Sequence, residues 1–313
     1  MLVVALGGNA MQEPDGDDSV ESDWERTRAT AEALARLTLE GHWRLVVTHG
    51  NGPQVGNHLL RSELGHADGG LPLLPLDVCV ADTQGGMGYV LQQSLGNAFH
   101  AAGVPAVVAS VVTQVLVDED DPAFSTPSKP VGEMIDDERA AVLRERGWAL
   151  APDRRRGGWR RVVASPNPRE IVEGHAIWTL VEEGVVVVTA GGGGIPVVHA
   201  PDGELRGVAA VVDKDLASAL VAADLGASAL LIVTDVEKVS TGYGTPDERP
   251  IDALTVAEAR ALQERGEFPP GSMGPKIEAL CRFVESTAGL GVVTTIEGAQ
   301  AALAGEGGTR ITP

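Results

Sequence analysis

The sequence predicts an α/β fold, a three-layer αβα sandwich built around an open, mostly parallel central sheet. Short, continuous runs of β-branched residues recur along the chain, and longer helical stretches separate them. Strands that are apolar throughout are typical of a parallel sheet covered by helices on both faces. Glycine-rich segments follow three of these runs, as expected where strand ends bind a ligand.

Hydrophobic periodicity gives the expected elements in chain order. The predicted strands lie at residues 2–6, 43–50, 104–118, 185–194, 229–236 and 291–296. The predicted helices lie at residues 22–40, 77–102, 167–183, 215–225, 255–265 and 275–288. Thr255 followed by Glu258 indicates a capping box, and Pro275 suits a first helical turn.

One segment breaks the alternation. Residues 119–165 carry little apolar pattern of strand length, so we expect a small protruding subdomain or lid there. The rest predicts a single domain over residues 1–313. Residues 199–207 have the composition of a hairpin-like turn, which suggests a boundary between an N-terminal lobe at about 1–200 and a C-terminal lobe at about 201–313.

Composition limits the classes of function. The chain has 44 acidic and 24 basic residues and a formal net charge of −20, which disfavours binding to nucleic acid. No apolar run approaches the roughly 20 residues of a membrane span, and no signal peptide is evident, so we expect a soluble, cytoplasmic protein. Cys79 and Cys281 stand far apart in apolar helical patterns, which indicates buried thiols and neither a disulfide nor a zinc site.

Lysine is scarce. The chain has four lysines against twenty arginines, and three of the lysines lie in motif-like segments: Lys129 in SKPVG, Lys214 in VVDKD and Lys276 in GSMGPK. Arginine serves wherever any positive charge is sufficient, so the remaining lysines are expected at positions that need the compact charge of an ammonium group. Biased codon usage is the alternative explanation.

The glycine clusters ALGGNA, THGNGPQVG and TAGGGGIP follow the strands near residues 2–6, 43–50 and 185–194. Glycine lets the main chain approach a phosphate closely. Neither a P-loop nor a dinucleotide-binding fingerprint is present. A phosphotransferase of this sequence must therefore hold phosphates with glycine turns and scattered lysines. His49 lies in the second cluster, where a packing role is favoured over that of a general base.

Lys214 and Lys276 are each predicted in the first turn of a helix, where a cation opposes the helix dipole. A bound anion would reverse that penalty. The functional interpretation is that Lys214 meets the transferred phosphoryl group while Asp213 orients the lysines and Lys129 swings onto the same group. The structural alternative is a local ion pair and a helix N-cap made by Asp213 and Asp215.

Ten segments occur in an order that resembles carbamate kinases of the amino acid kinase family. They are LVVALGGNA, THGNGPQVG, TQGGMGYVLQQ, KPVG, RRVVASPNPREIVE, AGGGGIPV, VVDKDLASALVA, IVTDVEKV, YGTPDERPI and GSMGPKIEAL. The resemblance implies a homodimer with an eight-stranded open sheet. It also implies reversible transfer, ATP + carbamate to ADP + carbamoyl phosphate, which can end arginine fermentation. Mg²⁺ would be carried mainly by the nucleotide phosphates, with no metal site of the protein's own.

The same resemblance places the phosphoryl acceptor in the N-terminal lobe and the nucleotide in the C-terminal lobe, and it assigns roles to single residues. Lys129, Lys214, Lys276 and Asp213 resemble the catalytic set, and Gly50, Asn51, Gly191, Gly192 and Gly193 resemble the carbamate side. Gly7, Gly8, Asn9, Thr234, Asp235, Tyr243, Met273 and Gly274 would surround the nucleotide. Many related kinases carry a lysine in the first strand; this chain has none, as in carbamate kinases, where Lys129 would take over that role. Asn167 departs from the family pattern, which leads us to expect lysine there.

Two alternatives remain open from the sequence. Another kinase of the same fold, acting on an acetylated amino acid, a nucleoside monophosphate or a phosphonate, would need a roomier acceptor site with an arginine for a carboxylate. A non-catalytic nucleotide sensor would be expected to lack one or more of the motif lysines. All three lysines are present, and the acceptor-side segments are glycine and asparagine, which favour a substrate as small as carbamate.

Overall fold

The computed structural model describes residues 1–11, 19–145, 147–153, 157–269 and 271–313, without the side chains of residues 9 and 133. Its main sheet has eight strands in the order β15-β17-β16-β12-β1-β2-β9-β3. They are β1 (Leu2–Leu6), β2 (Leu45–His49), β3 (Val108–Ser110), β9 (Val186–Thr189), β12 (Ala229–Val233), β15 (Ala253–Thr255), β16 (Leu290–Thr294) and β17 (Thr309–Thr312). All neighbours pair in parallel except β16 and β17, so the sheet is mostly parallel, as predicted.

Helices cover both faces of this sheet. They are α1 (Val20–Glu40), α2 (Gln54–Gly69), α3 (Leu76–Ala101), α5 (Gly174–Glu182), α6 (Lys214–Asp224), α7 (Val256–Glu264), α8 (Met273–Thr287) and α9 (Ala299–Ala304). Alternate residues of β1 enter different cores: Leu2 and Val4 pack with α1, α3 and α9, whereas Val3 and Ala5 pack with α5, α6 and α8. Two-sided burial explains the continuous apolar strands and confirms the predicted three-layer sandwich.

A four-stranded sheet, β11-β10-β4-β8, lies beside the main one. Its strands are β4 (Gln114–Val117), β8 (Pro168–Ile171), β10 (Ile195–His199) and β11 (Leu205–Gly207), and the short pair β13 (Ser240–Thr241) and β14 (Arg249–Pro250) lies elsewhere. β10 and β11 pair antiparallel, which confirms the hairpin predicted at residues 199–207. Thr255 and Glu258 form the predicted capping box at the start of α7.

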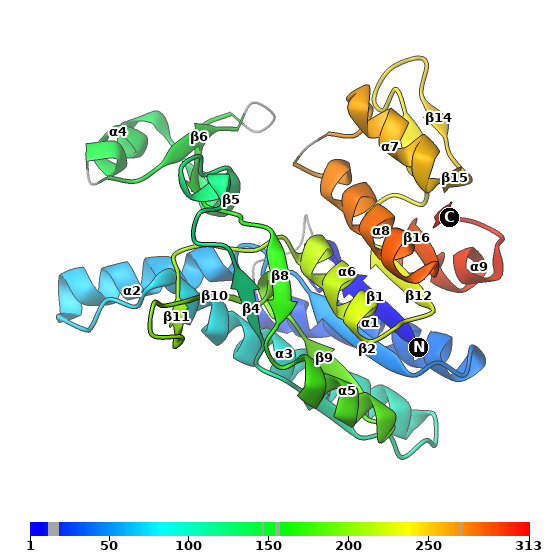
Figure 1. Cartoon of the computed structure of the whole chain (residues 1–313). Coiled ribbons are helices and arrows are strands. Elements are labelled where there is room, and N and C mark those ends of the chain that lie inside the picture. The colour runs from blue at the N-terminus through cyan, green and yellow to red at the C-terminus, as the bar shows by residue number, and fades with distance from the viewer. Residues whose placement is uncertain (12–18, 146, 154–156, 270) are drawn as a thin grey trace.

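We call β5 (Lys129–Ile135), α4 (Asp137–Glu145), β6 (Leu150–Pro152) and β7 (Trp159–Val163) together the arm. Its three strands form a separate sheet in the order β5-β7-β6, and Figure 1 shows β6 and α4 standing away from the main sheet. The arm lies within residues 119–165. The division into an N-terminal and a C-terminal lobe near residue 200 stays a prediction.

Three element predictions were wrong. The helix expected at 167–183 begins only at Gly174, because Pro166 and Pro168 favour extended backbone, and Pro168–Ile171 pairs with β4 as β8. The run at 104–118 forms two strands in different sheets, β3 and β4. The helix α2 was not predicted, because its three glycines and many polar residues hide its periodicity.

Cys79 and Cys281 are buried free thiols, as expected. No helix in the described residues is long and apolar enough to cross a membrane.

Candidate active site

The glycine clusters meet at one edge of the main sheet. β1, β2 and β9 are neighbours that run in parallel, so their carboxyl ends, Leu6, His49 and Thr189, lie together. The turns that follow contain Gly7 and Gly8, Gly50 and Asn51, and Gly191 to Gly193. The acceptor-side residues predicted from the sequence therefore lie beside the first glycine turn, where a parallel sheet places its ligand.

Close packing explains why glycine occupies two of these positions. Gly192 has φ +65°, and a Cβ there would lie 2.6 Å from Nδ2 of Asn51. A Cβ on Gly50 would lie 3.2 Å from Cδ of Lys214. A side chain at residue 192 would collide with Asn51, and one at residue 50 would press on Lys214, so glycine is what allows both turns to pack this closely.

The three motif lysines converge on two aspartates at the start of α6. Asp213 is the N-cap of α6 and accepts a hydrogen bond from the backbone N–H of Asp215. Its other carboxylate oxygen accepts from Nζ of Lys129, at 2.5 Å, so the arm reaches the main domain. Asp215 accepts from Nζ of Lys214 and, at 3.0 Å, from Nζ of Lys276 at the start of α8.

These contacts divide the three lysines between the two aspartates, and the catalytic role expected for Asp213 stays a prediction. The carboxylate that holds Lys214 and Lys276 together is that of Asp215, because the side chain of Asp213 is occupied by the helix N-cap and by Lys129. The structural alternative described these aspartates correctly, since both the N-cap and the local ion pair exist. Neither contact excludes a role in phosphoryl transfer, because both leave the three ammonium groups close together.

The network is buried, which sets its charges. Burial lowers the pKa of Lys214, and the neighbouring ammonium of Lys276 lowers it further, while Asp215 opposes both. Burial alone would raise the pKa of Asp215, but the two lysines outweigh it and hold that pKa well below its usual range. Asp215 is therefore ionised, and two positive charges share one carboxylate. The excess positive charge is suited to bind an anion.

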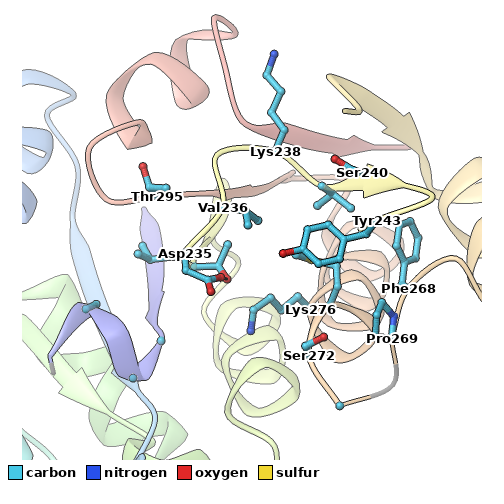
Figure 2. Close-up of a pocket in the computed structure, with 18 of the residues that line it drawn as sticks. Asp235, Val236, Lys238, Ser240, Tyr243, Phe268, Pro269, Ser272, Lys276 and Thr295 are labelled. Carbon is cyan, nitrogen blue, oxygen red and sulfur yellow. The ribbon is translucent and has the colours of Figure 1, made fainter. Parts of the chain in front are cut away.

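A cleft of about 770 Å³ opens beside this network. Of the predicted nucleotide-site residues, Gly7, Gly8, Thr234, Asp235, Tyr243 and Met273 line it, together with Lys214 and Lys276. Figure 2 shows the Lys276 side chain extending into the cleft, with Tyr243 and Phe268 to one side and Asp235 to the other. If the phosphates of a nucleotide lay near Lys276, its base would lie in the part of the cleft near Tyr243 and Phe268.

The remaining predicted residues lie elsewhere. Gly274 is the second residue of α8 and does not line the cleft, and the side chain of Asn9 lies outside the described residues. The cleft lining does not include Lys129, Asp213 or the acceptor-side glycines either. Gly50 lies against the side chain of Lys214, and Lys129 contacts Asp213 at the start of α6. Asn167 is exposed and accepts hydrogen bonds from Arg282, so its departure from the family pattern leaves the cleft unchanged.

Sequence reasoning missed several residues of the site. Asp215 was considered only as a local partner of Lys214, although its place beside that lysine was the available signal. Arg160 of β7 and Arg26 of α1 line the cleft, as do Glu267 and Glu297. Among so many arginines nothing in the sequence singles these out, since only the fold brings α1 and the arm to the same cleft.

His49 is a buried structural residue. It is 1% exposed, and its Nδ1 lies 2.8 Å from the carbonyl oxygen of Gly50. Burial lowers its pKa to about 4, and the hydrogen bond with Gly50 opposes that shift only in part. The neutral imidazole therefore packs against the glycine turns, as the sequence favoured, and a Cβ on Gly191 would lie 2.4 Å from its Nε2.

This shift predicts a dependence of stability on pH. Between pH 6.5 and about 4 the unfolded chain protonates His49 while the folded protein does not, so stability falls as the pH falls through this window, by about 3 kcal/mol in total. We expect a His49→Gln variant to lose less stability than the natural protein over the same window. Urea unfolding at pH 7 and pH 4.5 measures the difference, and equal losses in the two proteins would contradict it.

Comparisons with known proteins show the family to which the chain belongs. The model of the amino acid kinase family matches residues 1–294. Carbamate kinase of Thermococcus kodakarensis is 45% identical over 311 residues, 99% of this chain and 98% of that protein. A carbamate kinase-like protein of Escherichia coli is 45% identical over 99% of this chain and 98% of its own length. The structure of carbamate kinase from Giardia lamblia bound to AMP-PNP has 39% identity and a TM-score of 0.91, and the match covers 99% of this chain and 98% of that one. The chain belongs to the amino acid kinase family.

Proposed function

We propose that this protein is a carbamate kinase, which transfers a phosphoryl group between carbamoyl phosphate and ADP to give carbamate and ATP. The observation that carries the proposal is the convergence of Lys129, Lys214 and Lys276, through Asp213 and Asp215, at glycine strand ends beside a nucleotide-sized cleft. Full-length similarity to carbamate kinases supports it. Other kinases of this fold and a non-catalytic sensor are not favoured by these relatives.

The acceptor side suits a planar group of a few atoms. Nδ2 of Asn51 is buried and has no hydrogen-bond partner within the part of the chain that the structure describes. An unpaired buried donor costs free energy until an acceptor reaches it. An oxygen of carbamate, or the carbonyl oxygen of carbamoyl phosphate, would supply that acceptor above Gly192. The Asn51 side chain packs directly against Gly192, so a substrate that hydrogen-bonds to Nδ2 lies close to this glycine turn.

The three lysines would stabilise the negative charge of the transferred phosphoryl group. The transferred phosphoryl group carries negative charge spread over its oxygens in the transition state, and preorganised cations lower that energy. Lys214 would contact this group from α6 and Lys276 would contact it from α8, while Lys129 approaches from the arm. Asp215 holds the first two side chains in place before substrate arrives, so little reorganisation is needed when charge develops.

Mg²⁺ would enter with the nucleotide. The described residues contain no group of three His, Cys, Asp or Glu side chains able to hold a metal ion. Magnesium retains water readily and is often bound by substrate phosphates together with one or two carboxylates. Asp235, which lines the cleft, is the carboxylate we assign nearest to the phosphates. Bound Mg²⁺ would neutralise part of the phosphate charge.

The proposal extends to the setting of the enzyme. We infer that it works in the cytoplasm, where its substrates are found, and makes ATP at the end of arginine fermentation. We also infer a homodimer. Leu71 and Leu73, between α2 and α3, and Val78, in the first turn of α3, are between 37% and 60% exposed, and a second subunit would cover such apolar side chains.

The test is a comparison of phosphoryl donors. ATP formation from ADP, Mg²⁺ and fresh carbamoyl phosphate is followed with hexokinase at several salt concentrations, and acetyl phosphate serves as the second donor. We expect kcat/KM for carbamoyl phosphate to exceed that for acetyl phosphate by roughly 100-fold or more, because acetyl phosphate keeps the carbonyl oxygen but has a methyl group in place of the amino group, and a site that hydrogen-bonds an N–H group rejects the analogue that lacks it. Equal values would indicate a kinase of different substrate.

A further inference from the structure

The arm touches the main domain along helix α2 as well as through Lys129. At the start of α2 the two backbones meet: a Cβ on Gly56 would lie 2.0 Å from Cα of Gly132 in β5. Gly132 has φ +73°, a conformation that favours glycine. The absence of a side chain at both positions lets the arm lie directly on the helix. This contact is a point of support around which the arm could turn.

A second contact lies two helical turns further on. Glu63 of α2 accepts a hydrogen bond from Nη1 of Arg161 in β7, at 2.9 Å. The two side chains are 27% and 24% exposed, so the ion pair is largely shielded from water. Within the arm, the Arg161 guanidinium also lies over the ring of Trp148, with Cζ 3.9 Å from the ring centroid. The guanidinium is therefore fixed within the arm and presents its free edge to α2.

These contacts share one face of α2. Gly56 and Glu63 are seven residues apart, which is two turns or about 10 Å along a helix. Leu59 lies between them, is 6% exposed, and packs in the same core as Val131 of β5 and Val163 of β7. One contact alone would let the arm rotate, whereas two contacts about 10 Å apart fix its angle.

The angle of the arm determines where Lys129 lies. Lys129 is the first residue of β5 and pairs with Val163, two residues from Arg161 on β7. Arg160, the next residue toward the tip, donates to the carbonyl oxygen of Gly132 and lines the cleft on the other face of the strand. A tilt of the arm sheet on α2 would move the Lys129 side chain relative to Asp213.

We propose that Glu63 and Arg161 are positioning residues, whose ion pair sets the angle of the arm on α2 and so holds Lys129 against Asp213 at the transferred phosphoryl group. The Gly56–Gly132 contact is the pivot. The proposal rests on the proposed role of Lys129 in transfer. Neither Glu63 nor Arg161 touches the substrate; they act through the arm.

A double-mutant cycle tests this dependence. Glu63→Ala keeps a good helix former in α2 while removing the acceptor. We expect kcat to fall roughly 3- to 30-fold, the range for coupling carried through a packed network, with the KM for ADP unchanged. Glu63→Gln, which keeps a neutral acceptor, should fall less. In a Lys129→Ala background Glu63→Ala should cause no further loss, because the residue it positions is gone.

The same loss with and without Lys129 would overturn the proposal, as would full activity in Glu63→Ala. Gly56→Ala provides a second variant, because its methyl group would push the pivot apart. Its matched control is Gly96→Ala in α3, where a Cβ would meet no atom within 4 Å. We expect reduced kcat in the first and natural activity in the second, with both proteins folded by circular dichroism. Equal kcat values would contradict the pivot.

A distance measurement separates this proposal from the proposed function. Val142 of α4 and Glu183 after α5 are exposed, and Cys79 and Cys281 are buried, so spin labels can be placed at Val142→Cys and Glu183→Cys. Glu63→Ala should broaden or shift the distance distribution between them. An unchanged distribution would overturn the positioning role whether or not the protein makes ATP. Failure of the natural protein to make ATP would instead count against the proposed function.

Discussion

Lys214→Ala is expected to lower kcat by roughly 1,000-fold or more, the range for loss of a cation that stabilises a phosphoryl transition state. Its side chain lies at the start of α6 and is 13% exposed, so water screens its charge only weakly. Lys276 remains on Asp215, but it then neutralises that carboxylate and has little charge left for the phosphoryl group. ADP should still bind, since most of the cleft lining is unchanged.

Steady-state rates and calorimetric titration with ADP measure the two effects separately. Lys214→Arg is the matched variant: it keeps the charge, but its planar fork is wider than an ammonium group and the space between Lys214 and Gly50 is small. We expect it to recover only part of the lost rate. A folded Lys214→Ala protein with more than a tenth of the natural kcat would show that this lysine is not at the reacting group.

Asp215→Asn is expected to destabilise the protein more than any other substitution in the network of lysines and aspartates. The expected loss is about 3–5 kcal/mol, the range for removing one partner of a buried ion pair. Two ammonium groups, 13% and 15% exposed, would then face each other without a carboxylate. Lys214 can relieve the repulsion by losing its proton, because its pKa is already lowered by burial. Its folded pKa would lie further below its unfolded value, so the variant should gain stability as the pH rises toward 10.

Anions give the decisive control for Asp215→Asn. Inorganic phosphate should raise the melting temperature of the variant more than that of the natural protein, because it replaces the missing negative charge. Natural Asp215 has a depressed pKa, so its own contribution to stability is present above pH 4 and is lost as the pH falls below that value. Natural stability in Asp215→Asn, with no response to phosphate, would contradict the network described here.

The fold could be predicted where local pattern and burial agree. Strands such as β1 and β12 are buried on both faces, so their apolar runs are unambiguous, and the capping box at Thr255 is a local signal. Prediction failed where tertiary contacts decide. The glycines of α2 lower its helix propensity, yet Gly56 is required by the approach of Gly132. No local pattern around residue 56 predicts that contact, because Gly132 lies far away in the sequence.

In the candidate site, too, local patterns indicated some residues in advance, whereas contacts between distant segments did not. Glycine turns and scarce lysines located Lys129, Lys214 and Lys276 in the sequence, because their chemistry is unusual for this composition. The assignment of partners needed the structure: Asp213 and Asp215 are the same residue type two positions apart, and only the backbone at the start of α6 decides which one turns toward Lys276. Cleft residues such as Arg160 come from a distant segment and could not be found by motif.

The most direct test of the central claim is a ³¹P NMR time course with purified protein, ADP, Mg²⁺ and carbamoyl phosphate. The account predicts that the carbamoyl phosphate signal falls as the γ-phosphate signal of ATP rises, one ATP for each carbamoyl phosphate lost, with little inorganic phosphate. Folded protein that binds ADP and leaves carbamoyl phosphate to decay only to inorganic phosphate, at the rate seen without protein, would contradict it.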